Sequence, residues 1–141
     1  MIQEYVLGLA LDKSKSSIRL VQKPKNSFEF GKLNGIGGLV IENEDQLGAM
    51  IREFYEQTGL ISYPQDWYLY GMMLGDAFQI YLFVRFNDDI LNLPGLTEET
   101  TLYDIADIKH PVISNLNWLL PLILDTDLSR MFISIKYNRE K

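Results

Sequence analysis

The sequence predicts one mixed α+β sandwich, a domain in which helices pack on a β-sheet. The length of 141 residues fits a single domain, and no internal repeat or long linker divides residues 1–141. Strand-like segments lie on both sides of a segment with helical spacing, and a second helical segment lies near the end. The hydrophobic fraction of 47% and the charged fraction of 23% are typical of a globular protein with one core.

Two strand-like segments come first in the chain. Residues 4–11 (EYVLGLAL) and 17–22 (SIRLVQ) are rich in β-branched and aliphatic side chains, and the polar residues 12–16 separate them. This pattern predicts a β-hairpin. A short alternating segment, 27–30, follows.

Residues 45–58 are predicted to form a helix. Asp45 is a candidate N-cap, and Gly59 is a candidate for the residue that ends the helix. A glycine cluster at 35–38 precedes it, where the backbone must turn tightly or approach another group closely. Apolar residues recur at the three- and four-residue spacing of a buried helix face: Leu47, Met50, Ile51 and Phe54.

The second half of the sequence predicts a pair of long strands followed by a loop. Residues 67–74 and 78–86 are strand-like, and Gly75 and Asp76 supply turn chemistry between them. The polar stretch 87–101 is predicted to be a loop.

A second helix and a last strand are expected near the end of the chain. Residues 112–124 are predicted to be helical, although Pro121 lies inside them and would bend the helix. Residues 131–137 alternate in polarity, which predicts a strand.

Charge and composition limit the partners that we expect. The formal net charge of −6 argues against a nucleic-acid polymer, which requires a face rich in lysine and arginine. A small nucleotide remains compatible, because divalent cations can lie between carboxylates and phosphates. The sequence has no cysteine, long apolar stretch or basic leader, so we expect a cytoplasmic protein without disulfides or a membrane partner.

The predicted helix 45–58 carries a cluster of polar side chains. Glu53, Glu56 and Gln57 are three and four residues apart and therefore share one face. Arg52 lies beside them, and Glu44 precedes the helix. Such a face can be merely solvated, but clustered carboxylates also suit Mg²⁺, which takes oxygen ligands.

The spacing of these residues resembles the motif of the Nudix hydrolase family, G-x5-E-x7-R-E-U-x-E-E-x-G-U, where U is aliphatic or aromatic. Eight of the nine specified positions match, and the exception is Gln57 where the motif has glutamate. The resemblance implies a Nudix fold, which is an α/β/α sandwich with a mixed sheet. The matching positions are Gly38, Glu44, Arg52, Glu53, Phe54, Glu56, Gly59 and Leu60.

The resemblance also implies roles for the helix residues. Glu53 and Glu56 match glutamates that bind Mg²⁺, for which Mn²⁺ is a possible substitute. Glu44 matches an acid that assists at the metal, and Arg52 matches an arginine that orients the glutamates. The implied reaction is attack of water on phosphorus, which cleaves a pyrophosphate bond.

Further ligands follow from the resemblance and from its one departure. Gly37 and Gly38 match the loop around the pyrophosphate, where a backbone carbonyl joins the metal ligands. Gln57 keeps an oxygen but loses the charge of a glutamate, so Gln57→Glu is expected to raise activity or metal affinity. Glu98 and Glu99 are candidates for the missing carboxylate, with a solvated loop as the alternative.

Two stretches indicate a substrate. Residues 33–38 (LNGIGG) resemble the WNGFGG stretch of Nudix triphosphatases that remove oxidised purine nucleotides, in which the asparagine, here Asn34, reads the base. Residues 118–122 resemble their late helix, but the preceding 113–117 contain no acid, so Asn115 is the candidate base contact. The alternative for Asn34 is an ordinary turn residue beside glycines.

The expected function is therefore hydrolysis of a (deoxy)nucleoside triphosphate to the monophosphate and pyrophosphate. Two alternatives stay open: another substrate such as ADP-ribose or a nucleotide sugar, and a non-catalytic nucleotide-binding or interaction module that lost turnover through Gln57. A homodimer is common among similar proteins, although the sequence predicts no interface.

Overall fold

The computed structural model describes residues 2–22, 32–95, 99–108, 112, 115–125 and 131–136. The predicted segment at 27–30 lies outside these ranges. Within them, no helix is both long enough and apolar enough to cross a membrane.

A mixed β-sheet forms the centre of the molecule, as predicted. Its strands in the described ranges are β1 (Gln3–Leu11), β2 (Ser17–Gln22), β3 (Leu33–Asn34), β4 (Ile36–Leu39), β5 (Tyr68–Leu74), β6 (Phe78–Phe86), β7 (Thr100–Asp104) and β8 (Ile133–Lys136). The order along the sheet is β3-β2-β1-β6-β5-β8, while β4 pairs with β1 and β7 pairs with β2. The β1·β6 and β5·β8 pairs are parallel, and the other strand pairs are antiparallel.

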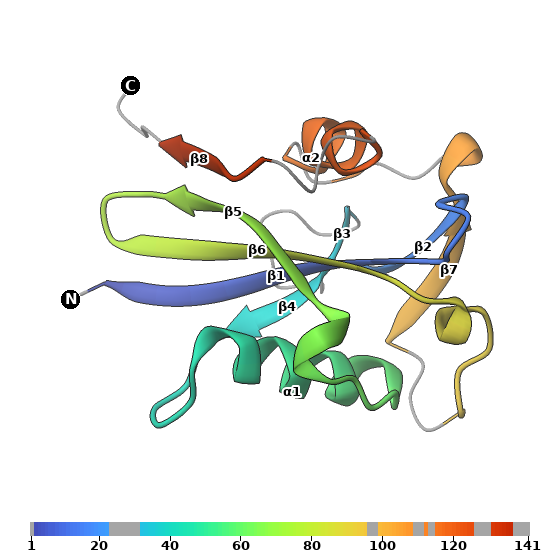
Figure 1. Cartoon of the computed structure of the whole chain (residues 1–141), viewed down its shortest axis with the longest axis horizontal. Coiled ribbons are helices and arrows are strands. Elements are labelled where there is room, and N and C mark those ends of the chain that lie inside the picture. The colour runs from blue at the N-terminus through green and yellow to red at the C-terminus, as the bar shows by residue number, and fades with distance from the viewer. Residues whose placement is uncertain are drawn as a thin grey trace.

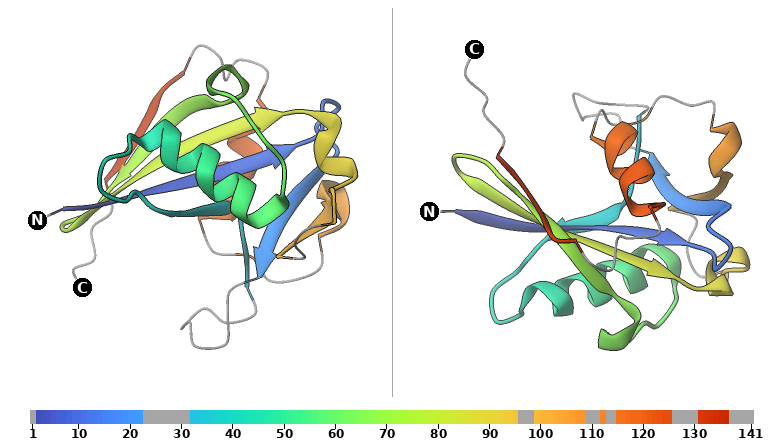
Figure 2. Two further views of the ribbon diagram at one scale, coloured as in Figure 1. Left: turned by 90° about the horizontal axis from the view of Figure 1, so that it is seen from below. Right: turned by 45° about the horizontal axis from the view of Figure 1, so that its top comes forward.

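The helices lie on opposite faces of this sheet (Figure 1 and Figure 2). Among the described residues they are α1 (Gln46–Thr58) and α2 (Leu116–Ile123). The same ranges contain the short 3₁₀ helices η1 (Pro64–Asp66), η2 (Asp88–Leu91) and η3 (Ile105–Asp107). One helix on each face gives the α/β/α sandwich that the sequence predicted.

Side chains of β1 alternate between two cores, because successive residues of a strand point to opposite faces. Leu7, Leu9 and Leu11 enter the core under α2, whereas Val6 and Ala10 enter the core under α1. Both edges of β1 are paired, with β6 on one side and with β4 and β2 on the other. The strand is therefore buried on both faces, which explains its nearly continuous apolar sequence.

Helix α1 begins and ends as predicted. The Asp45 carboxylate accepts a hydrogen bond from the Gly48 backbone N–H at 2.7 Å, which caps the first turn. Gly59 has a φ of +80° and donates its backbone N–H to the Tyr55 carbonyl at 2.8 Å. Glycine tolerates this left-handed conformation, so the chain can leave the helix there.

The predicted loop at 87–101 was wrong at both ends. Residues 88–91 form η2, which Asn87 caps by accepting the Asp89 N–H at 2.9 Å. Residues 100–104 (TTLYD) form β7, in which only the adjacent Leu102 and Tyr103 are hydrophobic, so the alternating apolar pattern of a strand is absent. Pairing with β2 satisfies the backbone of β7, so the strand depends on a partner distant in sequence.

The predicted helix at 112–124 starts later than expected. Val112 instead forms an isolated parallel bridge with Leu33, and α2 begins at Leu116. Pro121 lies inside the helix as predicted. The last strand is Ile133–Lys136, shorter than the predicted 131–137, of which residue 137 lies outside the described ranges.

Candidate functional site

The predicted helix residues meet the glycine-rich strand where β4 runs alongside α1 (Figure 1). Gly38 pairs with Val6 of β1, and Gly37 pairs with Leu7. A Cβ atom on Gly38 would collide with the Glu53 carboxylate, and one on Gly37 would collide with the β1 backbone. Glycine at these two positions therefore lets a helix carboxylate lie directly against the strand.

Arg52 is the centre of an ion-pair network on α1. Its guanidinium binds both carboxylate oxygens of Glu44, through Nη2 at 2.7 Å and Nε at 3.1 Å. Nη1 donates to Glu53 at 3.1 Å and to Glu56 at 3.4 Å. Nη2 also donates to the Leu39 carbonyl at 3.0 Å, which ties the helix to the end of β4. The orienting role that the motif implied for this arginine stays a prediction.

The network carries more negative than positive charge. Hydrogen bonds from Arg52 hold the pKa of the Glu44 carboxyl below its ordinary value, although burial acts in the opposite direction. The same contact raises the pKa of Arg52, so both groups are charged at neutral pH. Three carboxylates face one guanidinium here, which leaves a formal surplus of two negative charges. Such a surface attracts cations and repels a free phosphate.

Gln57 lies in the motif position at which a glutamate is expected. Its side-chain Nε2 donates to Glu53 Oε1 at 2.7 Å and to the Gly37 carbonyl at 3.1 Å. The residue is buried, with 9% of its surface exposed. Its NH₂ group therefore bridges the helix carboxylate and the strand backbone.

These oxygens are of the type that suits a hard divalent cation. Glu53 Oε1 and the Gly37 carbonyl both accept hydrogen bonds from Gln57 Nε2. A small, partially positive NH₂ group therefore already lies between two oxygens that could ligate a cation. No three acidic, histidine or cysteine side chains in the described ranges are grouped tightly enough to hold a metal. The reason is visible in the network, since Glu44 and Glu56 turn toward Arg52 and residue 57 is an amide.

The two asparagines that were predicted to contact a base have local contacts in the structure. Asn34 is the last residue of β3, and its Oδ1 accepts the N–H of Gly35 at 2.8 Å. Asn115 occupies the N-cap position of α2, and its Nδ2 lies 3.9 Å from Met73 Sδ. Their base-reading roles stay predictions.

The loop acids that could complete a metal site precede β7. Glu98 lies outside the described ranges. Glu99 is exposed and directly precedes Thr100, the first residue of β7. Its role as a ligand also stays a prediction.

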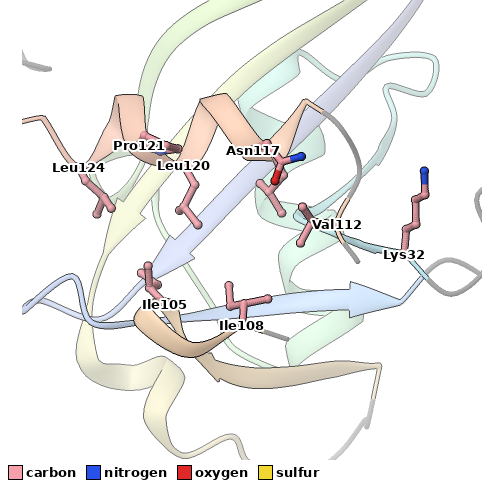
Figure 3. Close-up of a pocket in the computed structure, with 9 residues that line it drawn as sticks. Lys32, Ile105, Ile108, Val112, Asn117, Leu120, Pro121 and Leu124 are labelled. Carbon is pink, nitrogen blue, oxygen red and sulfur yellow. The ribbon is translucent and has the colours of Figure 1, made fainter. Parts of the chain in front are cut away.

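A pocket of about 670 Å³ lies between α2 and the segment around η3 (Figure 3). Its walls are mainly aliphatic, and Lys32 and Asn117 contribute the polar atoms. Leu116 and Leu120 of α2 and Leu124 at its C-cap are four residues apart, so they share one face of the helix, a spacing that does not reveal what the face covers. The remaining lining residues are Ile105, Ile108, Val112 and Pro121.

Comparisons with known proteins bear on the fold. No protein-family model and no curated protein matches the sequence. Among solved structures, the mutator MutT protein from Bacillus halodurans superposes with a TM-score of 0.73 and 16% identity, over 97% of this chain and 90% of that one. A Nudix hydrolase from Nitrosomonas europaea gives 0.61 and 14%, over 98% and 80%. A Nudix-family hydrolase from Clostridium perfringens gives 0.59 and 18%, over 86% and 94%.

The chain therefore has the fold of the MutT/Nudix hydrolases, which confirms the fold that the motif predicted. The similarity extends over nearly the whole described chain, including the sheet and both helices.

Proposed function

We propose that the chain is a Nudix hydrolase that cleaves the pyrophosphate bond of a small nucleotide and depends on a divalent cation, Mg²⁺ or Mn²⁺. The observation that carries the proposal is the grouping of Glu53, Arg52 and the Gly37 carbonyl where β4 meets α1. Arg52 and Glu53 lie within the segment that has the Nudix spacing, and Gly37 immediately precedes it, on a chain that has the Nudix fold.

The surplus negative charge explains why a cation is needed. A phosphate approaching Glu53 and Glu56 would be repelled by their carboxylates unless a cation lay between them. Glu53, Glu56 and the Gly37 carbonyl are the groups that would hold it, with Gln57 contributing its amide oxygen after reorientation. When bound, the cation supplies neutralisation of phosphate charge and activation of the attacking water.

The protein's own residues fix the geometry. Arg52 holds the Glu44, Glu53 and Glu56 carboxylates in place and cannot lose its proton, so the network stays oriented during turnover. Gly38 presents no side chain, so the Glu53 carboxylate can lie directly against the strand backbone there.

For the substrate we propose a (deoxy)nucleoside triphosphate, cleaved to the monophosphate and pyrophosphate. Support comes from the LNGIGG stretch and from the pocket beside α2, which Lys32 lines immediately before that stretch. One short segment, residues 32–38, thus connects the pocket with the charged network. The aliphatic walls suit the apolar part of a ligand, and the lysine suits an anionic part.

The test is to incubate the protein with nucleoside triphosphates, ADP-ribose and nucleotide sugars in Mg²⁺ or in EDTA. We expect pyrophosphate release from triphosphates in Mg²⁺ only. Glu53→Gln should abolish most of this release, whereas Glu42→Gln, the same change at an exposed position before α1, should not. Unchanged turnover in Glu53→Gln would refute the proposed site. Release of monophosphates from ADP-ribose or a sugar nucleotide instead would reassign the substrate.

A nucleotide-binding module without turnover is the second candidate, and Gln57 favours it. The position has an amide whose NH₂ faces the oxygens that would ligate the metal. Nucleotide-dependent thermal stabilisation without release of any product would select this alternative.

A further inference from the structure

We infer that the Gln57 amide takes the place of a cation between Glu53 and the Gly37 carbonyl, and that a divalent cation binds there only after the amide turns over. The inference rests on the cation-binding part of the proposed function and not on hydrolysis. It concerns the resting state of the site and the affinity for the metal.

The orientation of the amide follows from the chemistry of its partners. A backbone carbonyl and an ionised carboxylate can only accept hydrogen bonds. The group between Gly37 O and Glu53 Oε1 must therefore be the NH₂ of Gln57, and its own oxygen must point elsewhere. Both hydrogens of the NH₂ are used, one on each partner.

A glutamate at position 57 would bring a carboxylate oxygen close to two other acceptors, Glu53 Oε1 and the Gly37 carbonyl. With 2.7 Å to Glu53 Oε1 and 3.1 Å to Gly37 O, such a carboxylate would have no donor between itself and either neighbour. Like charges this close are strongly unfavourable in a buried place unless a cation or proton neutralises them. Gln57 removes the need for a cation or proton, because its NH₂ group donates a hydrogen bond to each of the two oxygens.

The same hydrogen bonds oppose a cation. The partially positive NH₂ occupies the space between the two oxygens and would repel an approaching metal. A half-turn of the amide about its last bond would direct Gln57 Oε1 toward the pair, so that three oxygens could surround a cation. The protein must break two hydrogen bonds for this, and the third oxygen is neutral, so its affinity is lower than that of a glutamate site. By the scale of other metal-site substitutions, we expect a difference of about 10- to 100-fold.

Metal affinity and thermal unfolding test this directly, with Gln57→Glu compared with wild type and with Gln65→Glu as a matched control. Gln65 is exposed in η1, so the control adds the same charge away from the network. In EDTA, Gln57→Glu should unfold at a lower temperature than either other protein. With Mn²⁺, followed by electron paramagnetic resonance, it should bind about 10- to 100-fold more tightly and gain more thermal stability.

A second measurement uses the wild-type protein alone. Heteronuclear NMR should show the two Gln57 NH₂ protons protected from solvent exchange in EDTA, with their signals assigned by their loss in Gln57→Met. Addition of Mg²⁺ should move these signals and accelerate their exchange. The inference is overturned if Mg²⁺ leaves the two NH₂ signals unchanged and the wild-type protein binds Mn²⁺ as tightly as Gln57→Glu does. The proposed function would remain intact in that case. Absence of Mn²⁺ binding in both proteins overturns the inference and the cation-dependent function together.

Discussion

Arg52 connects three carboxylates and one backbone carbonyl through a single guanidinium. A lysine could reach one or two of these oxygens but could not bind Glu44 with two parallel hydrogen bonds. The planar guanidinium therefore holds Glu44 with two nitrogens while Nη1 contacts Glu53 and Glu56, and the importance of this geometry can be measured.

We predict that Arg52→Lys lowers kcat about 10- to 100-fold while changing KM little, because the carboxylates lose their fixed orientation. Steady-state pyrophosphate release with a nucleoside triphosphate measures the effect. Thermal unfolding should show that the variant is folded. Wild-type kcat in Arg52→Lys would mean that the charge alone, without the fork, is sufficient.

The motif spacing was enough to predict which residues of α1 group together, because three- and four-residue spacing fixes positions on a helix. It could not predict the direction of the Gln57 amide. That direction depends on Gly37, which is twenty positions earlier and reaches the helix only through the pairing of β4 with β1. The pocket beside α2 was also beyond prediction, since Lys32 is far in sequence from η3 and α2, which supply the other walls.

At the scale of elements, the structure agreed with predictions made from local sequence signals but differed where an element depends on pairing with a distant strand. The caps Asp45 and Gly59 act on the backbone next to them, so the limits of α1 were predictable. Strand β7 was missed because its residues are polar and its hydrogen bonds come from β2. The start of α2 was predicted too early because Val112 pairs with Leu33, a contact that helical periodicity does not reveal.

The turn between β1 and β2 contains a second predictable local signal, the Asp12 carboxylate. It accepts hydrogen bonds from the backbone N–H groups of Ser16 and Ser17 at 2.8 and 3.1 Å. The hydroxyls of Ser14 and Ser16 add bonds at 3.0 and 2.9 Å. Burial would raise the pKa of Asp12, but the four hydrogen bonds together lower it from 3.8 to about 2.

We predict that Asp12 makes the stability of the protein depend on pH in the acidic range. A pKa that is lower in the folded state stabilises the protein above the unfolded value of 3.8, and this stabilisation is lost as the pH falls toward 2. Asp12→Asn should lower the free energy of unfolding by about 1–2 kcal/mol at neutral pH and flatten its decline between these values. Urea unfolding at several pH values measures this. Asp76→Asn, in the exposed turn between β5 and β6, should keep the wild-type decline.

At the scale of the whole molecule, the sheet separates a charged face from a ligand-sized pocket. The helices α1 and α2 lie on opposite faces of the sheet (Figure 2). The ion-pair network is on α1, and the pocket is lined by α2. The segment 32–38 contributes to both, through Lys32 at the pocket and Gly37 at the network. Because the ion-pair network lies on α1, the packing of α1 on the sheet sets the position of this network.

Arg85 helps to fix that position from inside the core. It lies on β6 with 1% of its surface exposed, and it binds the two carboxylate oxygens of Asp89 at 2.8 and 2.9 Å. Its guanidinium also lies 4.7 Å from the ring centre of Phe54 on α1 and 5.7 Å from that of Trp67. One buried cation thus joins β6, η2 and the underside of α1.

We predict that Asp89→Asn lowers the free energy of unfolding by about 2–4 kcal/mol, because it leaves the charge of Arg85 buried without a counter-ion. Asp88→Asn is the matched control, since Asp88 is exposed. An asparagine at position 88 keeps the side-chain oxygen that accepts the Lys13 N–H. Chemical denaturation measures both variants. Because α1 rests on Arg85 through Phe54, Asp89→Asn should also weaken Mn²⁺ binding at the distant network. Equal stability of the two variants would show that the rings, and not Asp89, neutralise the buried guanidinium.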